Sequence, residues 1–241
     1  MKSPVSLLWI VALCFSLSAG GAPAQTLPVT EPLISLNSEK GSRLLLESED
    51  NRAYWPLSIQ FVTQKNQAFC GVASIVMVLN ALGVPAPSTP EFEPYKTFTQ
   101  DNLLNEYTEK VLPVSVLAKI GMTLDQIGGI LNTYSAKADV RHADETSLEE
   151  FRSLARQALS TPNHYVVMNY LRRSIGQERG GHISPLGAYD AETDRFLVLD
   201  VSRYKYPPIW VEAAGLYSAM NTPDSDNQNR NRGFVIVTPG R

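Results

Sequence analysis

Histidine and cysteine are scarce in this sequence of 241 residues, which contains three histidines and two cysteines. The sequence also has no excess of positive charge, because 21 lysines and arginines stand against 24 aspartates and glutamates and give a formal net charge of −3. It shows no basic run, internal repeat or low-complexity tract. A protein that binds nucleic acid or an anionic membrane surface needs a basic face. We therefore expect neither kind of partner.

The first 24 residues have the pattern of a secretory signal peptide. Lys2 precedes an apolar stretch at residues 5–17, and Ala22-Pro23-Ala24 matches a cleavage site of the A-x-A type. A transmembrane anchor is the alternative, but the apolar stretch is shorter than the roughly 20 residues that a spanning helix needs. Cleavage after Ala24 would remove Lys2 and no acidic residue, so the net charge would change from −3 to −4. We expect an exported, periplasmic protein without a membrane anchor.

Cleavage would also remove Cys14 and leave Cys70 as the single cysteine of residues 25–241, which are enough for one domain with a full core. Exported proteins usually pair their cysteines in disulfides. An unpaired Cys70 is therefore either buried and inert or kept for its reactivity. A lone thiolate also makes a poor metal site, because soft divalent ions are held by several thiolates or imidazoles. We predict no metal site in the protein.

Cys70 lies at the start of the most apolar segment of the chain. Nine of the eleven residues at positions 72–82 are apolar, which predicts an element buried on all sides. Its β-branched residues favour a strand. Its length, and Gly83 followed by Pro85, favour a helix. We predict a buried helix with Cys70 in its first turn, where free N–H groups and the helix dipole stabilise a thiolate. A small apolar side chain in the core is the alternative role of Cys70.

The rest of the chain predicts helices first and strands later. Residues 58–64 have the pattern of a short extended segment, and a proline-rich surface loop follows the buried helix. Capping-box spacings at Thr123 and Ser147 predict amphipathic helices that end near Tyr134 and Leu159. The segments that predict strands are residues 165–170, 183–189, 195–199 and 234–237. Helices followed by antiparallel strands indicate an α+β fold.

Only one of the three histidines has the surroundings of a catalytic base. His142 ends a polar, charged segment and His164 follows Thr-Pro-Asn in a loop, so we expect both at the surface. His182 begins a predicted strand directly after Gly180 and Gly181, which allow close backbone approach. Because a thiolate nucleophile needs a base that titrates near neutral pH, His182 is the candidate partner of the cysteine.

Asp200 and Gln64 complete the candidate catalytic set. If the second and third predicted strands form a hairpin, His182 falls opposite residues 200–202 and Asp200 shares its face of the sheet. Asp200 would then orient the imidazole, although an ordinary strand-end aspartate is the simpler interpretation. Gln64 lies six residues before Cys70. Its amide could donate to an oxyanion together with the Cys70 backbone N–H, although Gln64 alone looks like a plain polar residue.

These residues together resemble the papain-like cysteine peptidases, in which a helical lobe carries the cysteine and an antiparallel sheet lobe carries the histidine and its partner. The chain is similar, more specifically, to phytochelatin synthase in its short bacterial form. The segments that carry this similarity are Q-F-V-T-Q-K-N-Q-A-F-C-G-V-A-S-I-V-M-V-L-N-A-L, Y-K-T-F-T-Q-D-N, Q-E-R-G-G-H-I-S-P-L-G-A-Y and F-L-V-L-D-V-S-R-Y-K-Y-P-P-I-W-V, and it extends over residues 55–237. The resemblance implies a triad of Cys70, His182 and Asp200, with Gln64 as the oxyanion donor.

The resemblance also implies a reaction on glutathione. The thiolate attacks the carbonyl of the Cys–Gly bond, glycine leaves, and the γ-Glu-Cys thioester passes to water or to a second glutathione, which gives phytochelatin. No cofactor is implied, although Cd²⁺ could enter as a glutathione thiolate, and a homodimer stays open. Plant and yeast members carry a cysteine-rich C-terminal region that this sequence does not show. We therefore expect hydrolysis to exceed transfer.

The γ-Glu end of glutathione carries an amine and a carboxylate, so it needs a charged pocket in which an arginine can bind the carboxylate through two hydrogen bonds. The residues that we expect there, guided by the family, are Asn169, Arg172, Gly181, Tyr204 and Arg232. Two other classes stay open at this point. One is a cysteine peptidase of broader specificity with the same triad. The other is a non-catalytic exported protein that binds thiols or metals through Cys70 and His182.

Overall fold

The structure, a computed structural model, describes residues 26–240. The predicted signal peptide at residues 1–24 lies outside the described residues and stays a prediction. Within residues 26–240, no helix is both long enough and apolar enough to cross a bilayer.

A seven-stranded sheet occupies the centre of the described chain, with strand order β1-β6-β5-β4-β3-β7-β2 and antiparallel pairing throughout. The strands are β1 (Ile34–Ser35), β2 (Ala136–His142), β3 (Tyr165–Leu171), β4 (Gly181–Asp190), β5 (Arg195–Val198), β6 (Ile209–Glu212) and β7 (Gly233–Pro239). The helices are α1 (Glu39–Glu47), α2 (Tyr54–Ile59), α3 (Cys70–Leu82), α4 (Glu106–Glu109), α5 (Val114–Ile120), α6 (Leu124–Leu131), α7 (Leu148–Ser160) and α8 (Ala213–Met220).

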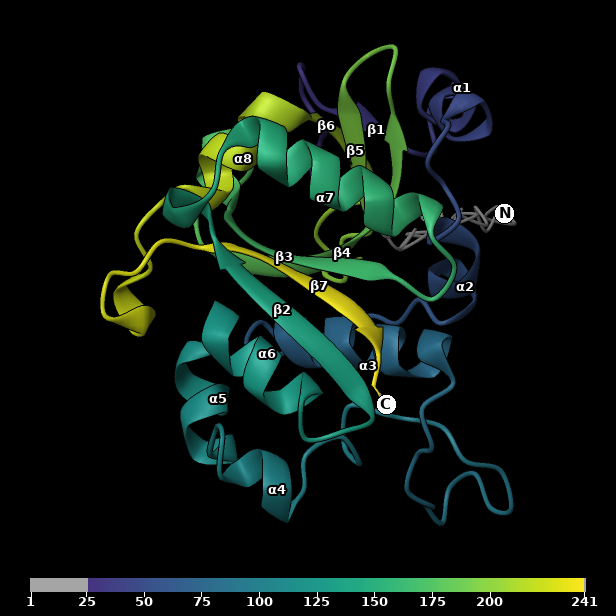
Figure 1. Ribbon diagram of the computed structural model, residues 1–241, viewed down its shortest axis with the longest axis vertical. Helices are drawn as coiled ribbons and strands as arrows, with labels where there is room; N and C mark the ends of the chain where they lie inside the picture. The colour runs from purple at the N-terminus through teal and green to yellow at the C-terminus, as the bar shows by residue number, and fades with distance from the viewer. Residues whose placement is uncertain (1–25, 241) are drawn as a thin grey trace, which may run out of the picture.

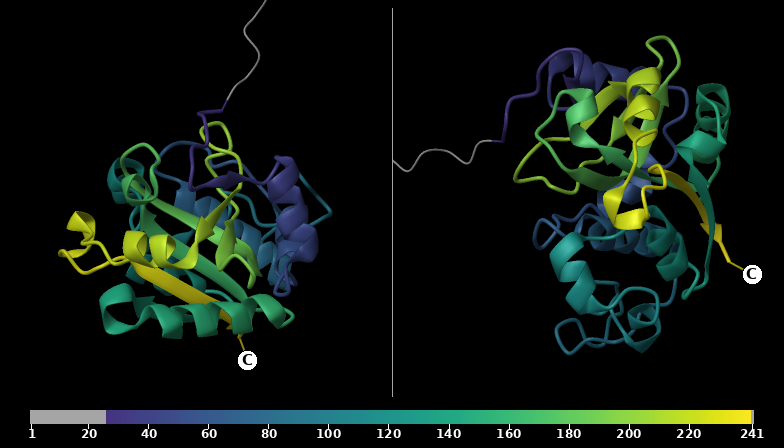
Figure 2. Two further views of the ribbon diagram at one scale, coloured as in Figure 1. Left: turned by 90° about the horizontal axis from the view of Figure 1, so that it is seen from above. Right: turned by 90° about the vertical axis from the view of Figure 1, so that its left-hand side faces the viewer.

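Helices cover both faces of the sheet. Figure 1 shows α3 and α6 below it, with α4 and α5 beyond them, and α7 and α8 above it. The right-hand view in Figure 2 also shows the helical part with α3 to α6 apart from α7 and α8. The predicted α+β class is therefore confirmed. The sequence patterns did not predict β1, β2, β6 and α8, so helices and strands alternate more than we expected.

The buried helix predicted after Cys70 is confirmed as α3. Its residues 70–79 are all buried, and Gly83 at its C-cap adopts the left-handed conformation with φ of 68°. The helix lies against β4 of the sheet and against α2 and α6. Burial on every side explains why its β-branched residues do not make it a strand, since packing overrides a weak local preference.

Two local predictions were wrong. Residues 58 and 59 belong to α2 instead of an extended segment, because Pro56 lies in the first turn of that helix, where its missing N–H costs no hydrogen bond. The helix that begins after Thr123 ends at Leu131 and not near Tyr134. Tyr134 instead donates a hydrogen bond of 2.6 Å to the Leu103 carbonyl, where the chain turns into β2.

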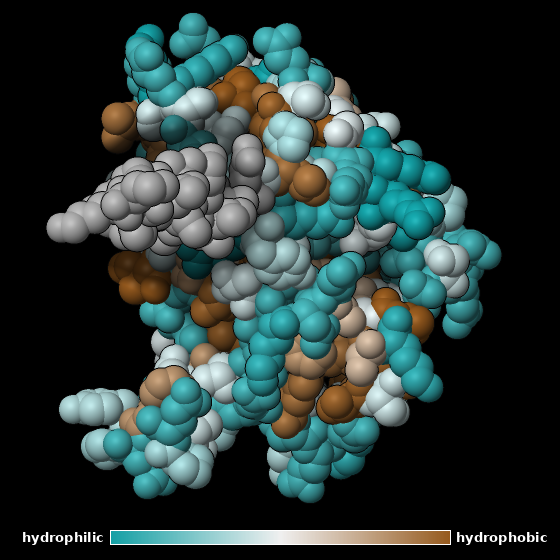
Figure 3. Space-filling view, turned by 180° about the vertical axis from the view of Figure 1, so that it is seen from behind, coloured by the Kyte–Doolittle hydropathy of each residue, from teal (hydrophilic) through white to brown (hydrophobic). Residues whose placement is uncertain are grey.

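His142 was also misplaced by sequence reasoning. It ends β2 with only 2% of its surface exposed, between the backbone carbonyl of Asn231 and the carboxylate of Asp125. His164 lies in the loop after α7 and is half-buried. Elsewhere, hydrophilic residues cover most of the face in Figure 3, with apolar residues in separate areas between them.

Replacement of Leu79 by alanine should show how much α3 contributes to stability. Leu79 is 0% exposed, whereas Leu46 in α1 is 78% exposed, so the same substitution can be compared in two helices. We expect Leu79→Ala to lower the free energy of unfolding by about 2–5 kcal/mol because it leaves a cavity. Leu46→Ala should change it by less than about 0.5 kcal/mol. Equal effects in chemical denaturation would contradict the burial of α3.

Candidate active site

Cys70 is the first residue of α3, and its thiol is free and buried, with 7% of the residue exposed. Because the first N–H groups of a helix have no partner within the helix, they surround the thiol with hydrogen-bond donors. The next residue, Gly71, allows the Met122 side chain to pack closely, since a Cβ at Gly71 would lie 2.8 Å from Met122 Sδ. The segment before α6 is therefore held beside the cysteine.

His182 lies near the start of β4 and faces Cys70. Its Nε2 is 2.8 Å from Asp200 Oδ1 and 2.9 Å from Ser184 Oγ. His182 and Cys70 line the same cavity, and Nδ1 is the ring nitrogen that does not face Asp200 or Ser184. The Tyr170 ring meets the imidazole edge-on, at 5.7 Å between centroids. The strand register sets this contact, because Tyr170 on β3 pairs with His182.

Asp200 follows β5 and has no exposed surface. The predicted hairpin of β4 and β5 is confirmed, although its regular pairing stops at Leu186 and Val198. Asp200 accepts hydrogen bonds from Arg172 Nη1 and Nη2 at 2.7 and 2.9 Å. The Ser202 backbone N–H, at 2.8 Å, is a further donor. Arg172 and His182 thus hold a buried carboxylate between two cationic groups.

The electrostatics of this group favour a thiolate and an imidazolium. Burial raises the pKa of Cys70, but the hydrogen bond and charge of His182, with the N–H groups of Ile183 and Gly71, outweigh it and lower the pKa. Burial lowers the pKa of His182, but the charge of Asp200 and its hydrogen bonds outweigh that effect and raise the pKa. A lowered thiol pKa beside a raised imidazole pKa gives the ion pair of a nucleophilic cysteine.

Asp200 itself stays ionised. Burial raises the pKa of its carboxyl, but the charges and hydrogen bonds of His182 and Arg172 hold it well below its usual range. An ionised Asp200 keeps the proton of His182 on Nε2 and directs Nδ1 to the sulfur.

Arg172 does not lie where the sequence reasoning placed it. It begins a 3₁₀ turn after β3, and its guanidinium points away from the cavity to Asp200, to Gln177 and to the face of Tyr206. The residue is 3% exposed. It therefore pairs with the Asp200 carboxylate and does not line the cavity over Cys70.

Gln64 and Tyr204 also lie outside the lining of the cavity that opens over Cys70. Gln64 is buried, and its Nε2 donates to the Asn66 carbonyl at 2.7 Å and to the Tyr204 hydroxyl at 3.1 Å. Its Oε1 has no hydrogen-bond partner within the described part of the chain. Tyr204 is half exposed. The structure thus joins Gln64 to Tyr204, next to the chain segment that leads into α3.

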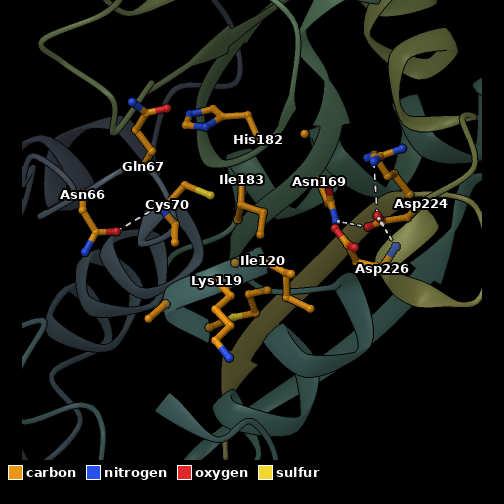
Figure 4. Close-up of a pocket in the computed structure, with 16 residues that line it drawn as sticks. Asn66, Gln67, Cys70, Lys119, Ile120, Asn169, His182, Ile183, Asp224 and Asp226 are labelled. Atoms are coloured by element: carbon orange, nitrogen blue, oxygen red, sulfur yellow. Dashed lines mark hydrogen bonds and ion pairs between the residues drawn. The ribbon is translucent and has the colours of Figure 1, made fainter. Parts of the chain in front are cut away.

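A cavity of about 470 Å³ opens over Cys70 and His182. Three of the expected substrate residues line it, namely Asn169, Gly181 and Arg232. Figure 4 shows Cys70 and His182 on one side and Asn169, Asp224 and Asp226 on the other. The two aspartates were missed by sequence reasoning, and the acidic cluster D-S-D in the loop before the last strand was the only signal for them.

Arg232 supplies a positive charge on the far side of the cavity. It is 8% exposed; its Nη2 lies 3.2 Å from Asp224 Oδ1, and its Nη1 donates to the Pro223 carbonyl. Its Nε has no partner among residues 26–240. Gly181 leaves the adjacent space open, because a Cβ there would lie 3.5 Å from Arg232 Nε. Asn169 Nδ2, 3.4 Å from Asp224 Oδ2, completes this polar group.

In the described residues, no three His, Cys, Asp or Glu side chains are arranged as a metal site. An α+β fold that presents a helix-terminal cysteine to a strand-borne histidine and its aspartate belongs to the papain-like class. A family model described as phytochelatin synthase matches residues 24–234. The chain therefore belongs to the phytochelatin synthase family.

Curated relatives agree with this assignment. Glutathione gamma-glutamylcysteinyltransferase 1 of Triticum aestivum is 33% identical over 210 residues, which are 86% of this chain and 41% of that protein. The protein of the same name from Lotus japonicus is 31% identical over 210 residues, 86% of this chain and 40% of its own length. The glutathione gamma-glutamylcysteinyltransferase of Schizosaccharomyces pombe is 29% identical over 186 residues, 77% of this chain and 43% of its own length. The chain thus spans less than half the length of these relatives.

The ion pair can be tested by alkylation of Cys70 with iodoacetamide across pH. The lowered pKa of Cys70 predicts that the rate stays high as pH falls below about 8.5, the ordinary value for a thiol. His182→Gln should raise that pKa and slow alkylation at least about tenfold at pH 6, since one pKa unit is a tenfold change in thiolate. His164→Gln, outside the site, is the control. Identical pH profiles for His182→Gln and the wild type would contradict the pairing.

Arg172→Gln tests the support of Asp200. We expect it to lower the free energy of unfolding by about 3–5 kcal/mol, because it leaves a buried carboxylate with one cation fewer. Arg173→Gln removes the neighbouring exposed arginine and should have an effect within about 0.5 kcal/mol. A small, equal effect of both variants in urea denaturation would show that the Arg172 contact is dispensable.

Proposed function

We propose that the protein uses Cys70 to cleave the Cys–Gly bond of glutathione through a thioester intermediate. The observation that carries the proposal is a cavity that brings Cys70 and His182 together and holds one buried arginine and two aspartates on its far side. The relatives' name, glutathione gamma-glutamylcysteinyltransferase, supports the choice of glutathione. A pocket of this size also suits a tripeptide.

The first half-reaction forms the acyl-enzyme. The Cys70 thiolate attacks the carbonyl carbon of the Cys–Gly bond, and the electron pair of the C=O bond moves to the oxygen. The Cys70 backbone N–H at the start of α3 is one donor to that oxyanion, and Gln64 Nε2 becomes the second if it exchanges its bond to the Asn66 carbonyl. His182 Nδ1–H protonates the departing nitrogen, so the C–N bond breaks, glycine leaves and the thioester remains.

The second half-reaction restores the free enzyme. Neutral His182 accepts a proton from water, or from the α-amine of a second glutathione, as that group attacks the thioester carbonyl. Collapse of the tetrahedral intermediate breaks the C–S bond and restores the Cys70 thiolate beside the imidazolium. Attack by water gives γ-Glu-Cys, and attack by the amine gives phytochelatin. Asp200 and Ser184 hold Nε2 through both steps, so Nδ1 stays directed at the reacting atoms.

We assign the far side of the cavity to the γ-Glu end of the substrate. Its α-carboxylate matches the unpaired Nε of Arg232, and its α-ammonium matches the carboxylates of Asp224 and Asp226. Asn169 offers an amide beside Asp224, and the small Gly181 leaves room for the substrate backbone. In this assignment Arg172 and Tyr204 do not touch the substrate.

The proposal further includes export to the periplasm after removal of residues 1–24. It requires no cofactor held by the protein, and Cd²⁺ would take part as glutathione thiolate, that is, as substrate. Folding of residues 25–241 as one catalytic domain and a homodimeric state belong to the same set of hypotheses.

Glycine release from glutathione tests the reaction. We expect the wild-type chain to release glycine, with γ-Glu-Cys or phytochelatin identified by mass with and without Cd²⁺. Cys70→Ala should reduce release below a few per cent because it removes the nucleophile. His164→Gln, which changes a residue outside the cavity, is the control and should retain full activity.

Two results would support the other classes of protein. Cleavage of casein with glutathione left intact would indicate a broader cysteine peptidase. Micromolar metal binding without turnover would indicate a thiol or metal carrier. Glycine release that persists in Cys70→Ala would remove the acyl-enzyme mechanism itself.

A further inference from the structure

The loop of residues 221–232, between α8 and β7, forms one wall of the cavity and carries Asp224, Asp226 and Arg232. Figures 1 and 2 show this loop, in yellow, projecting sideways beyond the sheet. It is closed internally by backbone bonds from Asp224 N to the Arg230 carbonyl, at 2.9 Å, and from Arg232 N to the Thr222 carbonyl, at 3.0 Å. Those bonds fix the shape of the loop, but they do not fix where it stands relative to Cys70.

Asp125, in the first turn of α6, holds the loop from outside. Its Oδ2 accepts hydrogen bonds from Asn227 Nδ2 at 2.8 Å and from Arg230 Nη1 at 2.9 Å. Its Oδ1 lies 3.1 Å from His142 Nε2. The Asp125 carboxylate thus contacts two side chains of the loop and His142 at the end of β2.

His142 extends this contact to the base of the loop. Its Nδ1 faces the Asn231 carbonyl, which is an acceptor, and its Nε2 faces the Asp125 carboxylate, also an acceptor. The ring therefore lies between the base of the loop and α6. Glu145 adds a weaker contact, at 3.3 Å from Arg230 Nη2. We call Asp125 and His142, with Asn227 and Arg230, the brace.

The brace connects the two walls of the cavity. Residues 118–122 line another side of the cavity, and α6 follows them directly, with Thr123 as its N-cap. Figure 4 shows Lys119 and Ile120 entering the cavity from one side and Asp224 and Asp226 from another. Asp125 lies three residues after Met122, which packs on Gly71 next to the nucleophile. A shift of the brace would therefore move the wall with Arg232 relative to the wall anchored at Cys70.

We propose that Asp125 and His142 are positioning residues that set the spacing of these two walls and thereby the affinity for the γ-Glu end of the substrate. This inference rests on the proposed function. Neither residue lines the cavity, so both act through the loop. Loss of the brace should weaken substrate binding, while the ion pair of Cys70 and His182, held by β4 and α3, stays as it is.

Asp125→Ala is the test, with Asp139→Ala as the matched control, because Asp139 is also a partly exposed aspartate paired with an arginine, but on β2 and away from the loop. We expect KM for glutathione to rise about tenfold in Asp125→Ala, the size of effect typical of a broken contact network. The kcat should change less than about twofold, and the rate of Cys70 alkylation should not change. Asp139→Ala should match the wild type in all three.

A second measurement does not depend on the reaction. Trypsin should cut after Arg230 faster in Asp125→Ala than in the wild type or Asp139→Ala, because the arginine loses its partner and the loop its anchor. If the wild type releases no glycine, the proposed function fails, and this cleavage rate alone decides whether the brace holds the loop.

Three results would overturn the inference: a KM for Asp125→Ala equal to that of the wild type, a lower kcat together with slower alkylation of Cys70, or an unchanged rate of trypsin cleavage. Should Asp125→Ala be too unstable to assay, Asn227→Ala and Arg230→Gln remove the partners from the exposed loop itself. Both should raise KM in the same way, and normal KM values in both would equally overturn the inference.

Discussion

The buried carboxylate of Asp200 is the interaction on which the rest of the site depends. A carboxylate without contact to water would ordinarily become neutral. Here Arg172 and His182 compensate its charge on two sides, at 2.7 and 2.8 Å. An ionised Asp200 fixes Nε2 of His182, and a fixed Nε2 leaves Nδ1 for the Cys70 sulfur. The reactivity of Cys70 therefore depends on the ion pair of Arg172 and Asp200, neither of which contacts the sulfur.

The sheet assembles this charge network from neighbouring strands. Arg172 follows β3, His182 lies on β4 and Asp200 follows β5, and these three strands are adjacent in the sheet. The helix that carries Cys70 is tied to the same strand as His182, because Ser74 Oγ donates to the carbonyls of both Cys70 and Ile183, at 2.8 and 3.2 Å. The spacing of nucleophile and base is thus set by packing of α3 on β4 and not by a mobile loop.

Sequence reasoning succeeded where the signal is local and failed where it is not. Cys70 precedes a long apolar run with a glycine cap, so its helix was predictable, and alternation in β4 and β5 placed Asp200 near His182. Arg172 looks from sequence like any arginine after a strand, and only the tertiary fold turns it toward Asp200. His142 has charged neighbours, yet its burial comes from the loop of residues 221–232, which is distant in sequence.

Buried polar atoms without a hydrogen-bond partner lower the stability of the fold, and they lie near the site. The buried side-chain atoms without a hydrogen-bond partner, within residues 26–240, are Gln64 Oε1, Tyr170 Oη, Gln177 Nε2 and Arg232 Nε. Each such atom costs about 1–3 kcal/mol when it is fully desolvated. All four belong to residues that contact the triad, its supporting arginine, the cavity or the segment before Cys70.

Three of these atoms belong to polar residues outside the apolar core, and the fourth, Tyr170 Oη, belongs to a core residue whose ring meets His182. Selection for stability alone would not concentrate unpaired polar atoms in one region. Their clustering around the cavity therefore indicates that these polar groups are positioned for a ligand and not for folding.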